Sequence, residues 1–95
     1  DAVVRERLTE LIGKIENDAG IGADDYRSAL AATFALDGFV YLLMRNLPCA
    51  TSEALLRAGE SQLTLEHAIL DWSSDLPFSA ELIAYAGERL KYWRS

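Results

Sequence analysis

The segment over residues 24–46 is the most continuously apolar part of the chain and limits what the rest can form. The seventeen residues between Arg27 and Arg45 carry a single charge, Asp37. A helix that is apolar on nearly all sides has to be covered by other elements. We therefore predict that residues 1–95 form a single-domain, all-α orthogonal bundle of about five helices around this central helix.

On a helical wheel, the central segment has a core face and a separate polar stripe. The core face contains Ala32, Leu36, Phe39, Val40 and Leu43. The stripe contains Thr33, Asp37 and Tyr41. An unpaired buried carboxylate there would be costly, so we expect Asp37 to be exposed, paired or protonated. Asp37 and Gly38 could instead form a hairpin turn. A lone strand would have no partner, so we expect a helix, with Gly38 as the place for a kink.

Four further helices are predicted from the spacing of apolar residues and from capping residues. Their expected ranges are 2–18, 51–58, 64–72 and a last helix that begins at residue 79. Short oxygen-bearing side chains mark where helices begin. The expected caps are Asp24 or Asp25, Thr51 or Ser52, Thr64, and Ser79. The expected buried stripe of the last helix is Ile83, Ala86, Leu90 and Trp93.

The charge of the chain indicates either an acidic face that is simply solvated or one that meets a basic partner. The net charge is −6, and from Glu53 to Glu88 there are seven acidic residues against Arg57 alone. Such a surface repels nucleic acid and anionic lipid. The apolar run is also shorter than the about 20 residues that a membrane span needs, so we expect no membrane partner.

Cys49 is the only cysteine, which rules out a disulfide within the chain. A single cysteine is most simply explained by a reducing compartment, so we predict a cytoplasmic protein. Cys49 and Ser52 have the spacing of a Cys-x-x-Ser redox motif, but without the βαβ context of such motifs we expect Cys49 to act as a small apolar residue. The chain begins at Asp1 without methionine, so a helical fragment of a larger assembly is one alternative.

Residues 51–70, TSEALLRAGESQLTLEHAIL, have two short helical patterns on either side of Gly59. This arrangement resembles the helix-turn-helix family, and the resemblance implies a DNA-binding accessory or regulatory domain. Glu60 departs from the pattern, because the family usually has an apolar residue after the turn glycine. The second helix would offer Gln62, Glu66, His67 and Asp71 to DNA, without lysine or arginine. Phosphate contacts supply much of the affinity for DNA, so we keep this function only as the alternative.

Catalytic and metal sites are not expected. His67 and Asp71 lie at i and i+4, as two metal ligands could, but zinc needs three or four ligands and the chain has one histidine and one cysteine. The sequence has no glycine-rich phosphate loop, and no nucleophile lies in an evident relation to His67. We predict a protein that is not an enzyme and has no cofactor.

These observations favour a non-enzymatic, acidic, helical protein-interaction module, such as an inhibitor, immunity protein, antitoxin or chaperone-like adaptor. The expected partner is another protein, basic in charge, and a homodimer through the first or last helix is also considered. The candidate contact residues are acidic or aromatic side chains and the single histidine. They are Asp37, Tyr41, Glu60, Glu66, His67, Asp71, Tyr85, Tyr92 and Trp93.

Overall fold

A computed structural model describes residues 2–31, 38–39 and 49–94, without the side chains of residues 93 and 94. Every regular element in these ranges is a helix, which confirms the all-α class. The α-helices are α1 (Ala2–Asn17), α2 (Asp24–Ala31), α4 (Ala50–Arg57), α5 (Leu65–Trp72) and α6 (Ala80–Arg94). A short 3₁₀ helix, η1 (Ser61–Leu63), connects α4 to α5.

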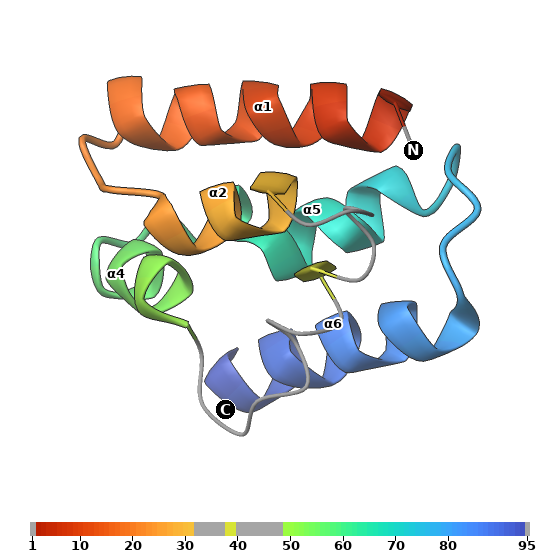
Figure 1. Ribbon diagram of the computed structural model, residues 1–95. Coiled ribbons are helices and arrows are strands. Elements are labelled where there is room, and N and C mark those ends of the chain that lie inside the picture. Colours follow the sequence, from red (N-terminus) through yellow and green to blue (C-terminus); the bar gives the residue numbers. More distant parts are fainter. Residues whose placement is uncertain (1, 32–37, 40–48, 95) are drawn as a thin grey trace.

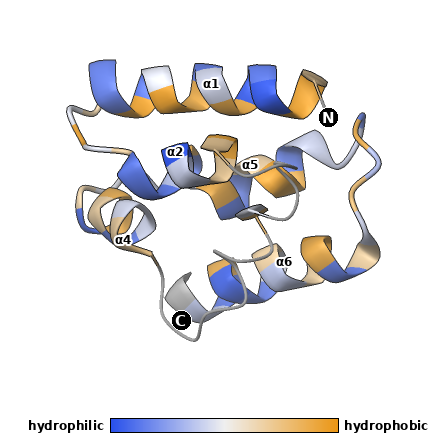
Figure 2. Ribbon diagram, in the orientation of Figure 1, coloured by the Kyte–Doolittle hydropathy of each residue, from blue (hydrophilic) through white to orange (hydrophobic). Residues whose placement is uncertain are grey.

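The helices are arranged in layers around one apolar core. In Figure 1, α2 and α5 lie between α1 and α6, and α4 closes one side. Within these layers, α1 packs on α2, and α5 packs on α6. The apolar side of α1 faces the interior in Figure 2, as its helical spacing requires. Its buried residues are Val4, Leu8, Leu11, Ile12 and Ile15.

The central helix predicted over residues 24–46 is described only in part. The structure shows α2 at its beginning and a helical conformation at Gly38 and Phe39, and the rest of the range lies outside the described residues. Phe39 is fully buried, as predicted, and meets Phe78 edge to face with ring centroids 6.4 Å apart. The other predicted core-face residues, Ala32, Leu36, Val40 and Leu43, lie outside the described residues.

Gly38 lies directly against α2. A Cβ atom built on Gly38 would stand 2.6 Å from Ala29 Cα and 2.9 Å from Ala29 Cβ. Only a glycine leaves room for two backbones at this distance. Gly38 is helical here, as we expected, and its neighbour Asp37 lies outside the described residues.

Two of the predicted helix caps are confirmed. The Thr64 side chain accepts a hydrogen bond from the backbone N–H of His67 at 3.3 Å, at the start of α5. The Ser79 side chain accepts one from the backbone N–H of Leu82 at 3.1 Å, at the start of α6. Each bond occupies one of the backbone donors that the first turn of a helix leaves without a partner.

The predicted caps of α2 and α4 are wrong. Asp24 and Asp25 lie inside the first turn of α2. Likewise, Thr51 and Ser52 lie inside α4, whose N-cap is Cys49 and makes no side-chain cap bond. The carboxylate of Asp25 instead accepts the backbone N–H of Thr51 at 3.1 Å. One helix therefore caps another, an arrangement that only packing can create.

The buried stripe of α6 differs by one position from the prediction. Ala86 and Leu90 are buried as expected, but Leu82 is buried in place of Ile83, which is half-buried at the edge of the core. The side chain of Trp93 lies outside the described residues. Among the described helices, none is long and apolar enough to cross a bilayer.

Candidate functional site

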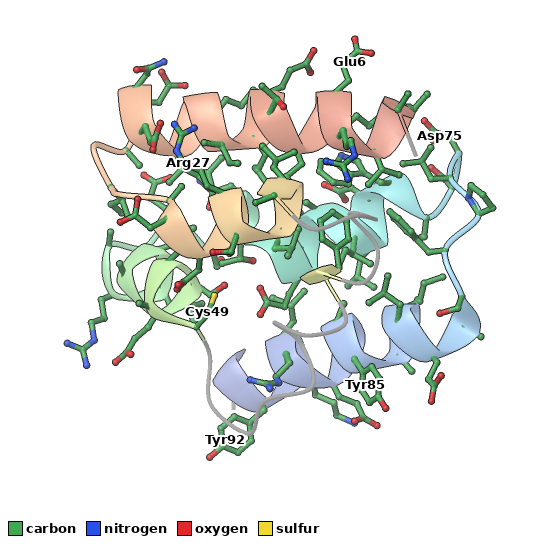
Figure 3. The ribbon with its side chains drawn as sticks, in the orientation of Figure 1. Glu6, Arg27, Cys49, Asp75, Tyr85 and Tyr92 are labelled. Carbon is green, nitrogen blue, oxygen red and sulfur yellow. The ribbon has the colours of Figure 1, made fainter. Side chains whose placement is uncertain are left out.

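The outer face of α6 carries the most exposed aromatic side chain among the described residues. Tyr92 is 75% exposed, and Tyr85, seven residues earlier, is half-buried. Both point away from α5 in Figure 3. Glu81 and Glu88 are exposed on the same side of the helix, since the positions 81, 85, 88 and 92 are spaced by four, three and four residues. We call these four side chains the α6 stripe.

The candidate residues on α5 separate into a surface pair and a buried carboxylate. His67 Nδ1 lies 3.2 Å from Asp71 Oδ2, an ion-pair distance without the alignment of a hydrogen bond. Glu66 was named as a candidate contact residue, but it is not accessible to a partner. Glu66 is only 3% exposed.

The other candidates are less informative. Glu60 is half-buried and accepts a hydrogen bond from Gln62 Nε2 at 2.6 Å. Asp37 and Tyr41 lie outside the described residues. Within the described ranges, no three His, Cys, Asp or Glu side chains gather as a metal site would require.

Glu66 ends a chain of buried hydrogen bonds that links α2, α4 and α5. The hydroxyl of Ser52 donates to Glu66 Oε1 at 3.0 Å, and the hydroxyl of Tyr26 lies 2.5 Å from Ser52 Oγ. Ser52 has one proton and uses it on Glu66, so Tyr26 donates to Ser52. Tyr26 Oη in turn accepts the backbone N–H of Leu65 at 2.8 Å. Cys49 Sγ donates to Ser52 Oγ at 3.4 Å.

Burial governs the electrostatics of this network. It raises the pKa of Glu66, against the opposing effects of its own backbone N–H, the Ser52 hydroxyl and the Arg89 guanidinium. Burial also raises the pKa of Tyr26 well above its ordinary value, and the nearby negative charge of Glu66 adds to this. The pKa of Cys49 is raised mainly by burial too, so its thiol stays protonated and poorly nucleophilic at neutral pH.

Sequence reasoning missed this network, although a local signal existed. Ser52 and Leu55 are three residues apart on α4, and both are buried. Glu66 and Ile69 have the same relation on α5. Each polar residue therefore shares the apolar face of its helix, and a polar residue at such a position requires a buried partner.

The buried Glu66 should make stability depend on pH. Its pKa is raised from 4.5 in the folded chain, so the stability that its protonated form contributes is complete below about pH 4.5 and is lost as the pH rises through the folded pKa. We expect Glu66→Gln to gain stability relative to the wild type between pH 4 and pH 7, because glutamine stays neutral and still accepts from Ser52. Urea unfolding at several pH values measures this difference.

Glu81→Gln is the matched control, because Glu81 is exposed on α6. The difference in free energy of unfolding between Glu81→Gln and the wild type should vary much less over the same pH range. A Glu66→Gln difference that stays constant with pH, or that falls as the pH rises, would contradict the assignment of a raised pKa to Glu66.

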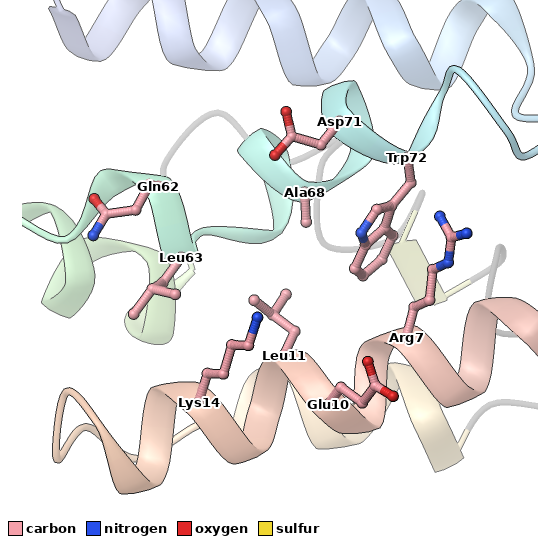
Figure 4. A pocket seen from close by; sticks show the side chains of 9 residues that line it. All are labelled: Arg7, Glu10, Leu11, Lys14, Gln62, Leu63, Ala68, Asp71 and Trp72. Atoms are coloured by element: carbon pink, nitrogen blue, oxygen red, sulfur yellow. The ribbon is translucent and has the colours of Figure 1, made fainter.

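A groove lies between α1 and the η1–α5 segment. Its volume is about 270 Å³, and it is partly open to solvent. Its apolar lining consists of Leu11, Leu63, Ala68 and Trp72. In Figure 4 the indole of Trp72 extends from α5 toward α1, between Leu11 and Arg7. Asp71 was the only one of the nine lining residues among the candidates from the sequence.

The chain has no match among protein-family models, curated proteins or solved structures. Its function therefore has to be inferred from its own residues.

Proposed function

We propose that this chain is a non-enzymatic protein-interaction module that binds a basic partner protein through the α6 stripe. The observation that carries the proposal is the alternation of Glu81, Tyr85, Glu88 and Tyr92 along one face of α6, with Tyr92 75% exposed. Tyrosine is enriched among the residues that dominate binding energy at interfaces. Two carboxylates beside the rings supply the charge that attracts a basic surface.

The charge of the whole chain supports the same partner class. The net charge of −6 speeds the encounter with a basic protein and slows the encounter with an acidic one. Two other exposed acidic residues are already paired, since Asp75 pairs with Arg7 at 2.6 Å and Glu53 with Arg57 at 2.6 Å. No ion pair joins Glu81 or Glu88 to another described residue, so both carboxylates are available to a partner.

The role would be that of an inhibitor, an immunity protein, an antitoxin or a chaperone-like adaptor, in the cytoplasm. The helix-turn-helix alternative stays a prediction that we do not pursue, since α5 contains no lysine or arginine and its Glu66 is buried. A fragment of a larger assembly would use the same face toward its neighbouring chain.

Affinity capture with matched variants tests the proposal. The wild type and Glu6→Lys should retain the same basic protein from lysate of the native host, whereas Glu88→Lys and Tyr92→Ala should lose it. Glu6 is an exposed glutamate that points away from the bundle on α1, so it matches Glu88 in charge and exposure. With the purified partner, Tyr92→Ala should weaken binding about thirtyfold or more, as for a residue that dominates an interface.

Three outcomes would contradict the proposal. The first is capture that all four proteins share equally, and the second is a captured partner that is acidic. The third is sedimentation showing that the pure chain dimerises and that Tyr92→Ala abolishes the dimer, which would assign the stripe to a second copy.

A further inference from the structure

We propose that the partner docks on the α6 stripe with a basic amphipathic helix that lies along α6. The inference rests on the function proposed above and adds the shape and the charge pattern of the docking element. The stripe positions are spaced by four, three and four residues, so Glu81 and Glu88 lie two turns apart, as do Tyr85 and Tyr92. This is the heptad spacing, which keeps two adjacent helices in register.

The backbone of the docking segment favours a helix over an extended strand. Extended segments commonly bind by adding a strand to the exposed edge of a sheet, where their backbone N–H and C=O groups find partners. Every regular element in the described part of the chain is a helix, and α6 uses its backbone groups within itself. An extended segment on α6 would therefore bury backbone groups without partners, whereas a helix satisfies its own.

The spacing of the charges matches a partner helix with lysine or arginine at every seventh position. Glu81 and Glu88 are separated by about 10.5 Å along the axis of α6, and the same seven residues in a partner helix cover the same distance. Tyr92 is 75% exposed, so its ring can contact an apolar side chain or a lysine stem between the paired charges. The 15 residues of α6 provide room for two heptads.

The charges disfavour a second copy of this chain as the occupant. Neither Glu81 nor Glu88 has an ion pair with another described residue, and each copy carries a net charge of −6. Two copies joined along α6 would bring four such carboxylates together, and like charges across an interface repel. A basic helix pairs with the same carboxylates instead.

Three synthetic peptides of equal charge test this inference. The first repeats the heptad Lys-Ala-Gln-Ala-Leu-Gln-Ala three times, so that a helix presents lysine and leucine on one face. The second has the same composition in scrambled order, and the third has a proline at its centre, which breaks the helix. By fluorescence anisotropy, the first peptide should bind the chain about tenfold more tightly than the other two, or better. Equal binding of the three peptides, or no binding of the first at 1 mM, would overturn the inference.

Variants of the chain tie the binding to α6. Glu88→Lys and Tyr92→Ala should each weaken binding of the first peptide about tenfold or more. Glu6→Lys alters the net charge as much as Glu88→Lys does, but on the exposed side of α1, and should leave the binding nearly unchanged. An equal loss in Glu6→Lys and Glu88→Lys would show that net charge, rather than the stripe, attracts the peptide.

A photo-crosslink separates this inference from the proposed function. Ala84 is exposed beside the stripe, so a benzophenone side chain placed there would contact whatever covers it. In the partner captured from the native host, it should attach within a helix that has lysine or arginine seven residues apart. Attachment to a strand, to a loop or to a second copy would overturn the docking helix. The proposed function would survive the first two results, whereas failure to capture any stripe-dependent partner would overturn it as well.

Discussion

Replacing Gly38 by alanine should lower the free energy of unfolding by about 1–3 kcal/mol or more, the range for overpacking a close contact. The added Cβ would stand 2.6 Å from Ala29 Cα and 2.9 Å from Ala29 Cβ. The nearest atom belongs to the backbone of α2, so no side-chain rotation relieves the overlap. The two helical segments would have to move apart and leave the core around Phe39 less well filled.

Gly13→Ala is the matched control, and it should raise the free energy of unfolding where Gly38→Ala lowers it. Gly13 lies inside α1, and a Cβ built on it meets nothing within 4 Å. Alanine there should raise the free energy of unfolding by about 1 kcal/mol through helix propensity alone. Urea unfolding of both variants measures the two changes in the free energy of unfolding. Equal effects at the two positions would show that helix propensity, rather than the contact with Ala29, decides what happens at Gly38.

Replacing Tyr26 by phenylalanine should lower the free energy of unfolding by about 1–3 kcal/mol, although the ring that fills the core remains. The hydroxyl accepts the backbone N–H of Leu65 at 2.8 Å and lies 2.5 Å from Ser52 Oγ. Leu65 is the first residue of α5, so its N–H has no acceptor within the helix. Without the tyrosine hydroxyl, this donor and the oxygen of Ser52 would each lose a partner inside the core.

Tyr85→Phe is the control for the loss of a hydroxyl. Tyr85 is half-buried, and its hydroxyl has no hydrogen-bond partner among the described residues, so its removal should change the free energy of unfolding by less than about 0.5 kcal/mol. Thermal or urea unfolding compares the two variants. A Tyr26→Phe variant as stable as Tyr85→Phe would mean that the buried hydroxyl network adds nothing to stability.

The features of the fold that the sequence predicted correctly depend on residues close together in the chain. Thr64 caps α5 and Ser79 caps α6 through donors three residues later, at 3.3 Å and 3.1 Å. Such bonds form within one turn of helix and need no other part of the molecule. The buried residues of α1 were equally predictable, because their spacing follows the helical period.

The largest errors concern contacts between distant residues. Thr51 receives its capping carboxylate from Asp25, 26 residues earlier, and Leu65 N–H finds its acceptor on Tyr26, 39 residues away. Glu66 was named as a candidate contact because it is one of the seven acidic residues between Glu53 and Glu88. Its spacing from Ile69 places it on the buried face of α5, but its partners, Ser52 and the nearby Arg89, lie on other helices.

By itself, the sequence determined that this chain is a bundle of helices, where α5 and α6 begin, and that it carries a net charge of −6. Only the tertiary structure decided which polar groups are buried together, why residue 38 must be glycine, and which side chains line the groove between α1 and α5. The physical reason is the distance along the chain over which each interaction acts. Helix periodicity and capping act over three or four residues, whereas burial and the contact of Gly38 with Ala29 exist only once the helices have packed.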